Sequence, residues 1–192
     1  MDRIDTKTGV VTDYAIANEA GEPLLGPNDC VFDKDGGLYF TDPNGSSLKN
    51  PIGSIYYVTP GTHRVYLVAH GLAYPNGVAV SNDGATLYFD ETPKQQVDAL
   101  SIHGPLQWGE PAAFGRVGIT GGPDGMRVAP DSTLYVASYG DGMVVHLSAN
   151  GAQIGVIPIS AGKNTTNLCL ADGDKALYVT ETQSNTIVKV SL

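Results

Sequence analysis

Cysteine is nearly absent from this sequence: only two of the 192 residues, Cys30 and Cys169, carry a thiol. Two cysteines fill neither a tetrahedral zinc site nor a disulfide framework. Each one lies two residues after an asparagine, at the start of a short apolar run. We therefore expect both thiols to be buried, unpaired and slow to react.

Charged residues are also scarce, at 16% of the chain, and positive ones are the scarcer kind: 11 Lys and Arg stand against 20 Asp and Glu. The resulting formal net charge of −9 excludes nucleic acid and anionic membrane surfaces as expected partners, because a polyanion would be repelled. An acidic protein of this kind can still bind a cation.

Long apolar runs are missing as well. The first twelve residues carry Asp2, Arg3, Asp5 and Lys7 and contain no signal-peptide core, and no later stretch approaches the length of a membrane span. We expect a cytoplasmic protein with no membrane partner.

Turn-forming residues, by contrast, are abundant. The chain has 24 Gly and 12 Pro, spread over its whole length without a collagen-like period. Many tight turns imply many short strands, so the composition predicts an all-β protein. A hydrophobic content of 42% is enough for the core of one domain.

A repeat of similar segments organises the chain. Each segment has an Asn or Asp before a short apolar strand, then a polar turn, then Leu-Tyr-Phe or Leu-Tyr-Val. The four segment starts are Pro27-Asn28-Asp29-Cys30, Pro75-Asn76-Gly77-Val78, Pro123-Asp124-Gly125-Met126 and Thr166-Asn167-Leu168-Cys169, and the later leucines are Leu38, Leu87, Leu134 and Leu177. A period in the forties with β-type runs is typical of β-propeller blades, each of four antiparallel strands.

The repeat predicts a single β-propeller domain over residues 1–192. Three complete blades are expected at about residues 24–70, 71–118 and 119–160, with partial blades at 1–23 and 161–192. In the third repeat we expect strands at 125–128, 134–138, 143–147 and 153–158. Because this arc leaves two sheet faces uncovered, we expect the chain either to self-associate through them or to be less stable than a form extended at its N-terminus.

Residues just before the first strand of each blade should meet at one mouth of the central channel. The repeat brings Asn28, Asn76, Asp124 and Asn167 to this ring. Carboxylate and amide oxygens converging on one point suit a hard divalent cation, and Ca²⁺ accepts such mixed ligation most readily, although Zn²⁺, Mn²⁺ or Mg²⁺ stay open. Pro-Asn-Gly and Pro-Asp-Gly are also common turn sequences, but a turn needs no fixed position in the blade.

These segments, together with Leu38-Tyr39-Phe40-Thr41-Asp42-Pro43 and Tyr178-Val179-Thr180-Glu181, resemble successive blades of the gluconolactonase and regucalcin family. Members of that family are six-bladed propellers with a divalent cation in the channel. The resemblance implies that Asn76 and Asp124 are direct metal ligands and that Asn28 is a ligand or a substrate contact.

The resemblance also implies a function, the hydrolysis of sugar lactones or related lactones as small-molecule substrates. The cation would polarise the lactone carbonyl, and Asp124 is the candidate catalytic carboxylate that takes a proton or orients the water. Asp29 and Asn167 are expected substrate contacts. For Tyr139, at the end of a second strand, substrate contact and simple packing are both open.

One feature departs from the family pattern. The family supplies a further Glu ligand from an earlier blade, and neither Glu19 nor Glu22 stands in a comparable motif. Glu91 and Glu181 close the second strands of their blades, where we interpret them as solvated strand ends rather than site residues. The alternatives to a lactonase are a non-catalytic propeller that binds a partner and an inactive truncated lactonase.

Overall fold

The computed structural model describes residues 1–192 and consists almost entirely of β-strands. The single helical element is one 3₁₀ turn, η1 (Thr92–Lys94). The structure contains no helix with the length and hydropathy that a membrane crossing requires. The strands are β1 (Asp2–Ile4), β2 (Val11–Asp13), β3 (Cys30–Phe32), β4 (Leu38–Asp42), β5 (Gly53–Val58), β6 (Val65–Leu72), β7 (Pro75–Val80), β8 (Thr86–Glu91), β9 (Gln96–Gly104), β10 (Gln107–Trp108), β11 (Ala112–Arg116), β12 (Gly122–Val128), β13 (Leu134–Tyr139), β14 (Met143–Leu147), β15 (Gln153–Pro158), β16 (Thr165–Ala171), β17 (Ala176–Glu181) and β18 (Thr186–Ser191).

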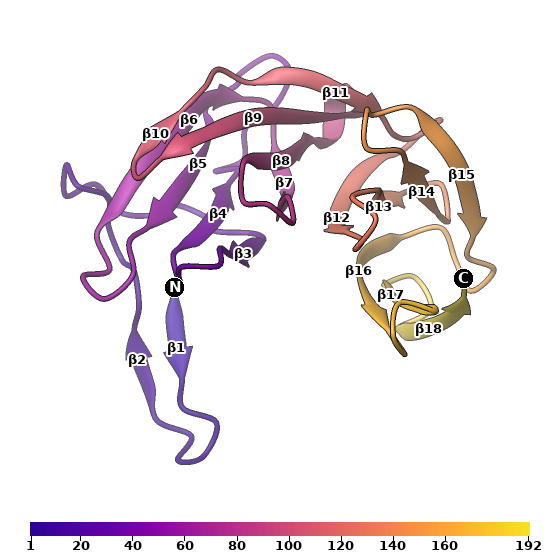
Figure 1. Cartoon of the computed structure of the whole chain (residues 1–192), viewed down its shortest axis with the longest axis horizontal. Coiled ribbons are helices and arrows are strands. Elements are labelled where there is room, and N and C mark those ends of the chain that lie inside the picture. Colours follow the sequence, from indigo (N-terminus) through magenta and orange to yellow (C-terminus); the bar gives the residue numbers. More distant parts are fainter.

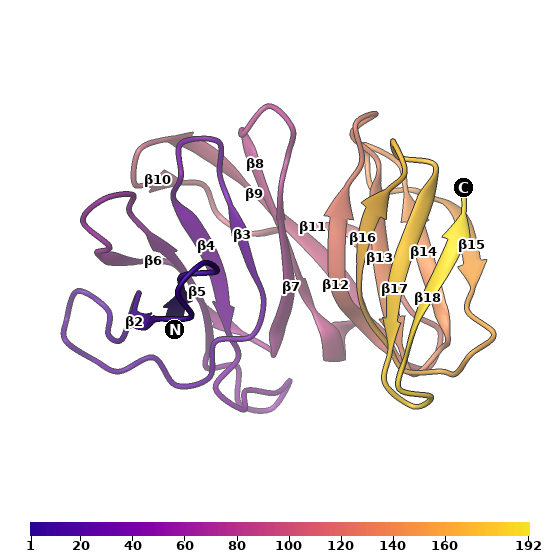
Figure 2. The ribbon, with the colours of Figure 1, turned by 90° about the horizontal axis from the view of Figure 1, so that it is seen from below.

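The strands form a β1–β2 hairpin and four antiparallel sheets, which we call blade 1 (β3–β6), blade 2 (β7–β11), blade 3 (β12–β15) and blade 4 (β16–β18). In blade 2, both β10 and β11 pair with β9. The blades follow one another around an arc, with β3, β7, β12 and β16 nearest its centre (Figure 1). Seen from the side, the sheets stand next to one another like the blades of a propeller (Figure 2). The predicted all-β propeller fold is confirmed.

Blade 3 tests the predicted strands most directly. The second, third and fourth strands lie within one residue of the predicted bounds, at β13, β14 and β15. The first strand, β12, begins three residues earlier than expected, because Gly122 and Pro123 pair with Tyr139 and Ser138 on the far side of a bulge.

A constant register explains why the same residue types recur. Cys30, Val78, Met126 and Leu168 lie opposite Phe40, Phe89, Val136 and Val179 in their respective blades. Apart from Cys30 these first-strand residues are buried, each in an apolar cluster shared with the preceding blade. Neighbouring blades therefore cover both faces of the inner strands of blades 2 and 3, as the nearly continuous apolar runs indicate.

The tyrosine of each Leu-Tyr pair shows which sheet face is left uncovered. Tyr39, Tyr88 and Tyr135 are 3%, 8% and 8% exposed, whereas Tyr178 in blade 4 is 36% exposed. The first three pack in the clusters that join their blade to the next one. No blade follows blade 4 in the structure, so the face that carries Tyr178 meets solvent.

Both cysteines are exposed, so the expectation of buried thiols is wrong. Cys30 lies opposite Phe40, on the face of blade 1 that turns away from blade 2. Cys169 lies opposite Tyr178, on the uncovered face of blade 4. Each thiol thus stands on an inner strand, as expected, but on one of the two sheet faces that no neighbouring blade covers.

Thiol labelling of the native protein should therefore be rapid at Cys169 and slower at Cys30. Burial raises the pKa of the Cys30 thiol, and the nearby Asp29 carboxylate adds to the rise, so less of the reactive thiolate is present at a given pH. A chromogenic disulfide reagent at pH 8, applied to Cys30→Ser and Cys169→Ser, measures each thiol alone. Protection of both thiols until the protein is denatured would contradict the exposed positions.

Candidate metal and active site

The candidate ligands Asn76 and Asp124 lie where the pairing between the first and second strands of their blades is interrupted. The pairing of β7 with β8 shifts between Pro75 and Val78, and that of β12 with β13 shifts between Pro123 and Met126. Asn76 and Asp124 lie in these bulges. A bulge leaves a residue outside the ladder and re-aims its side chain, so Asn76 and Asp124 depart from the regular alternation of their strands.

Asn167 does not share the position of Asn76 and Asp124, so this part of the predicted ring is wrong. Because Leu168 lies opposite Val179, the register gives the ring position in blade 4 to Thr166. Asn167 corresponds instead to Asp29. The hydroxyl of Thr180 accepts the Asn167 N–H at 2.9 Å, as the hydroxyl of Thr41 accepts the Asp29 N–H at 3.1 Å.

Asn76 has the clearest character of a ligand. Its side chain is 7% exposed, and its amide oxygen Oδ1 is buried without a hydrogen-bond partner. The backbone is fixed by Thr41, whose hydroxyl donates to the carbonyl of Asn76 at 2.6 Å. A buried amide oxygen without a donor is costly unless something else neutralises it, and a cation does so.

Asp124 lies in a strongly acidic environment. Burial raises the pKa of Asp124 to about 7, and the Asp29 carboxylate adds to the rise; the Gly125 backbone N–H and the Asn76 amide counteract it. Burial likewise raises the pKa of Asp29, and it raises the pKa of Asp90 well above its ordinary value, helped by the charge of Asp124. Three neighbouring carboxyl groups therefore repel one another when they are ionised, and a divalent cation would neutralise this repulsion.

Two glycines let the inner strands approach this closely. A Cβ on Gly77 would lie 2.1 Å from the backbone oxygen of Asp124 and 2.8 Å from Oδ2 of Asp90. A Cβ on Gly125 would lie 2.3 Å from the side-chain amide of Asn167. Only residues without a side chain can occupy these positions, so the two glycines set the spacing between neighbouring inner strands.

Gly77→Ala should destabilise the protein by about 1–3 kcal/mol, because the new methyl group collides with backbone. It should also weaken metal binding, since the strand carrying Asp124 must move. Gly155→Ala is the matched control, because its Cβ would meet only ordinary contacts, 3.6 Å from His146. Urea unfolding measures both variants. Equal stability of the two would show that the inner strands are not closely apposed.

The structure places the remaining predicted residues at the rim. Asn28 is exposed in a pocket of about 540 Å³ that Asn44 and Tyr74 also line, and its backbone N–H donates to the carbonyl of Thr41. Tyr139, 42% exposed, lines a separate pocket of about 420 Å³ together with Thr92. By register Asn28 holds in blade 1 the position that Asn76 holds in blade 2, since Cys30 lies opposite Phe40 as Val78 lies opposite Phe89.

Glu91 and Glu181 are not solvated strand ends, and that interpretation is wrong. They are 2% and 1% exposed. Glu91 accepts the backbone N–H of Ala73 and forms an ion pair with Lys94, both at 2.5 Å. Glu181 accepts the backbone N–H of Asn164 at 2.8 Å, and hydrogen bonds, chiefly from Ser184, hold its pKa at about 2. Both carboxylates anchor the loops that lead into the first strands.

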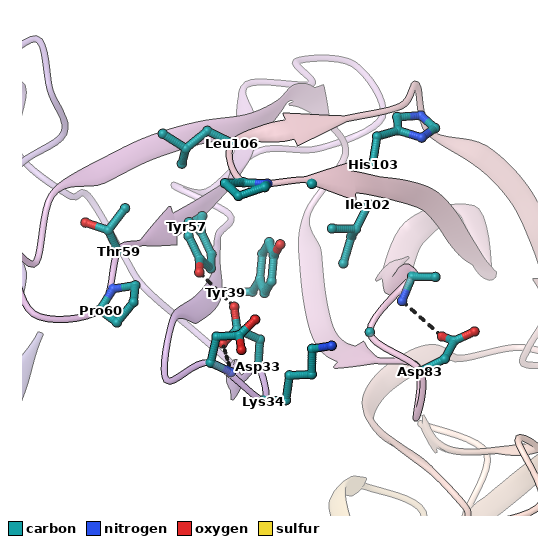
Figure 3. A pocket seen from close by; sticks show the side chains of 15 residues that line it. Asp33, Lys34, Tyr39, Tyr57, Thr59, Pro60, Asp83, Ile102, His103 and Leu106 are labelled. Atoms are coloured by element: carbon teal, nitrogen blue, oxygen red, sulfur yellow. Dashed lines mark hydrogen bonds between the residues drawn. The ribbon is translucent and has the colours of Figure 1, made fainter.

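Another pocket, of about 670 Å³, lies between blades 1 and 2 at the opposite ends of their inner strands (Figure 3). Tyr39 and Tyr57 form its wall, and Tyr57 donates to Asp33 at 2.7 Å. The β3–β4 and β7–β8 turns close it, with Asp33, Lys34 and Asp83. None of the predicted ligands lines this pocket.

The donor set at the channel mouth fits a hard cation. No group of three or more His, Cys, Asp and Glu side chains is arranged to hold a metal. The donors here include an amide oxygen instead: Asn76 Oδ1 has no partner, and the carboxylates of Asp124 and Asp29 lie among groups with raised pKa values. Oxygen ligands of this mixed kind suit Ca²⁺ better than Zn²⁺.

Known proteins are similar to this chain in sequence and in fold. Lactonase drp35 of Staphylococcus aureus (strain MRSA252) is 37% identical over 137 residues, which are 69% of this chain and 41% of that protein. Diisopropyl-fluorophosphatase of Loligo vulgaris is 30% identical over 195 residues, 94% of this chain and 62% of that protein. The chain thus spans about two fifths to three fifths of the length of these relatives.

Solved structures of similar fold include members of the same group of proteins. A gluconolactonase from Xanthomonas campestris superposes with a TM-score of 0.79 at 26% identity, covering 93% of this chain and 61% of that one. A structure described as a calcium-binding protein, regucalcin, from Agrobacterium tumefaciens gives a TM-score of 0.77 at 27% identity, covering 93% and 60%. The profile of the SMP-30/Gluconolactonase/LRE-like region matches residues 2–183. The chain therefore belongs to the SMP-30/gluconolactonase/LRE-like family.

Proposed function

We propose that the chain carries the site of a metal-dependent hydrolase that opens lactones, with Ca²⁺ as the cation. The observation that carries the proposal is the buried, unpartnered Oδ1 of Asn76 beside the carboxylate of Asp124. The names of the relatives, a lactonase, a gluconolactonase and a calcium-binding regucalcin, support the same class of substrate and metal.

Asn76 and Asp124 would hold the cation, with Asn28 as a further ligand or substrate contact. A bound divalent cation would polarise the lactone carbonyl and stabilise the negative charge that develops on its oxygen. The Asp124 carboxylate takes a proton from the attacking water as the oxygen of that water bonds to the carbonyl carbon. The ring C–O bond then breaks, the ring oxygen receives the proton, and the product is a hydroxy acid.

Substrate contacts are proposed at the same mouth. Asp29 and Asn167 occupy equivalent positions in blades 1 and 4, and each accepts the N–H of the following residue with its own side-chain oxygen, at 2.9 and 2.8 Å. The second carboxylate oxygen of Asp29 accepts the Val78 N–H at 3.3 Å and can still accept from a hydroxyl of a polyhydroxylated substrate, and the amide nitrogen of Asn167 can donate to one. Tyr139 at the rim is the proposed outer contact.

A calcium titration followed by a lactone hydrolysis assay tests the function. Binding of Ca²⁺ with release of hydroxy acid is the expected result, and δ-gluconolactone is the first substrate to use. Diisopropyl fluorophosphate belongs in the same assay, because a relative is named diisopropyl-fluorophosphatase and this compound offers a phosphoryl oxygen in place of the carbonyl. Absence of binding at millimolar Ca²⁺ would favour a non-catalytic propeller or an inactive form.

The affinity for Ca²⁺ should rise with pH and level off near pH 7. Protons compete with the cation for Asp124, whose pKa is raised to about 7, so affinity should change by about tenfold per pH unit below that value. Isothermal titration calorimetry between pH 5 and pH 8.5 measures the slope. A flat profile across this range would show that Asp124 is not a ligand.

A further inference from the structure

The hydroxyl of Thr92 stands where the two proposed ligands meet. Thr92 opens the 3₁₀ turn η1, directly after β8. Its Oγ1 accepts from Nδ2 of Asn76 at 3.2 Å and donates to the carbonyl of Pro123 at 2.8 Å. Pro123 immediately precedes Asp124, so one hydroxyl joins the Asn76 side chain in blade 2 to the backbone before Asp124 in blade 3.

The direction of these bonds decides how the Asn76 amide is oriented. A hydroxyl has one proton to donate, and the Pro123 carbonyl can only accept. The Thr92 oxygen is then left as an acceptor, so it pairs with Nδ2 of Asn76 and would repel Oδ1. The amide is held with Nδ2 toward Thr92, and Oδ1 is left as the buried atom without a partner.

The position of Thr92 itself is fixed by packing. A Cβ on Gly122 would lie only 2.2 Å from the carbonyl oxygen of Thr92, so the start of β12 rests against η1. The carboxylate of Asp90 lies 3.3 Å from the Thr92 hydroxyl. The Thr92 side chain therefore has little freedom to turn away from Asn76.

We propose that Thr92 is a positioning residue that sets the Asn76 amide, presenting its oxygen to the cation and its nitrogen to the protein. This inference rests on the proposed function. The Thr92 hydroxyl is engaged by Asn76 and Pro123 and does not bind the cation in this arrangement. It acts through Asn76, as outer-shell hydrogen-bond partners orient metal ligands in general.

Thr92→Val is the informative variant, because valine keeps the shape and removes the acceptor. The affinity for Ca²⁺ should fall by about 10–100-fold. Thr92→Ser keeps the hydroxyl and should stay within about threefold of the wild type, well short of that loss. Thr165→Val is the matched control: the Thr165 hydroxyl is buried and shares its one proton between the carbonyls of Ser138 and Met143, at 2.7 and 3.1 Å. This control should lose stability but bind Ca²⁺ as the wild type does.

A second measurement needs neither metal nor activity. In the metal-free wild type, the Asn76 side-chain NH₂ should exchange slowly with solvent, and it is assigned in the NMR spectrum by its absence from Asn76→Ala. Thr92→Val should lose this protection and Thr92→Ser should keep it. Rapid exchange in the wild type would overturn the inference without any variant having to fold.

The results separate this inference from the proposed function. If the wild type binds no Ca²⁺, the proposed function fails, and the amide exchange alone decides the role of Thr92. If the wild type binds Ca²⁺ and Thr92→Val binds it equally well, the function stands and the positioning role is wrong. An equal loss of affinity in Thr92→Val and Thr165→Val would also overturn it, because stability would then explain both.

Discussion

Asp124→Ala is expected to abolish Ca²⁺ binding and lactone hydrolysis together while leaving the fold intact. Asp124 is the charged residue among Asn28, Asn76 and Asp124, and its carboxylate lies beside the unpartnered Asn76 oxygen. Loss of a direct ligand should exceed the roughly 10–100-fold effect of outer-shell partners. Calorimetry and the hydrolysis assay measure the two losses, and circular dichroism checks the fold. Retention of full activity would exclude Asp124 from the site.

Asn76→Ala provides the graded comparison. A neutral amide oxygen contributes less to a divalent cation than a carboxylate does, so this variant should lose less affinity than Asp124→Ala. Equal affinities for the two variants would contradict that ranking.

Asp124→Asn separates ligation from stability. Because the folded-state pKa of Asp124 is raised above its ordinary value, the folded protein binds this proton more tightly than the unfolded chain does. The metal-free wild type should therefore lose stability as pH rises from about 4 to about 7. Asp124→Asn should lose less stability over this range, because Asp29 and Asp90 with their raised pKa values remain. It should be more stable than the wild type at pH 8 without metal, yet gain nothing from added Ca²⁺. A wild type whose stability does not fall over this range would contradict the raised pKa.

The fold could be predicted because its signals are local and repeated. Leu38, Leu87, Leu134 and Leu177 are each the first or second residue of a second strand and pair in the same register, and the turns between strands carry Gly, Asp and Asn. Period and strand type then follow from the chain alone. Asn76 and Asp124 could be predicted as neighbours for the same reason, since each lies two residues before the apolar residue, Val78 or Met126, that pairs with the second strand.

The register of the first strand of blade 4 could not be predicted from the chain. Leu168 and Cys169 are both apolar, so a shift of the strand by one residue leaves the hydrophobic pattern unchanged. Only the pairing of Leu168 with Val179 fixes it. The positions of the thiols failed for a different reason. Cys30 and Cys169 lie on inner strands as predicted, but whether a strand face is buried depends on the neighbouring blade, which the local sequence does not describe.

The contacts between blades could not be predicted from the sequence either. Glu91 looks like any acidic residue at a strand end, and its bond to the Ala73 backbone depends on how a loop returns to the sheet. Thr92 follows it without any motif of its own, although its hydroxyl joins two blades. Contacts of this kind depend on atoms that are 16 to 31 residues apart in the chain, so no residue pattern marks them.

The uncovered face of blade 4 leads to the second large expected effect, self-association. Tyr178 is 36% exposed there while its counterparts in the other blades are buried, and Ile187 in β18 is 68% exposed. β18 is also an edge strand, because it pairs only with β17. Apolar faces and free strand edges promote association between chains. The chain should therefore form oligomers whose mass increases with concentration.

Replacing Ile187 and Tyr178 together by glutamate should shift the protein toward the monomer, because each copy would bring like charges to the contact. Ile154→Glu is the matched control: Ile154 is 56% exposed, but it lies in β15 of blade 3 and not on the uncovered face of blade 4. Light scattering coupled to size exclusion, over a roughly hundredfold range of protein concentration, measures the mass of all three proteins. The expected result is association of the wild type and of Ile154→Glu, and a monomer for the double variant. A wild type that stays monomeric over the whole range, or a double variant that associates as strongly as the wild type, would show that the exposed face of blade 4 does not mediate contact between chains.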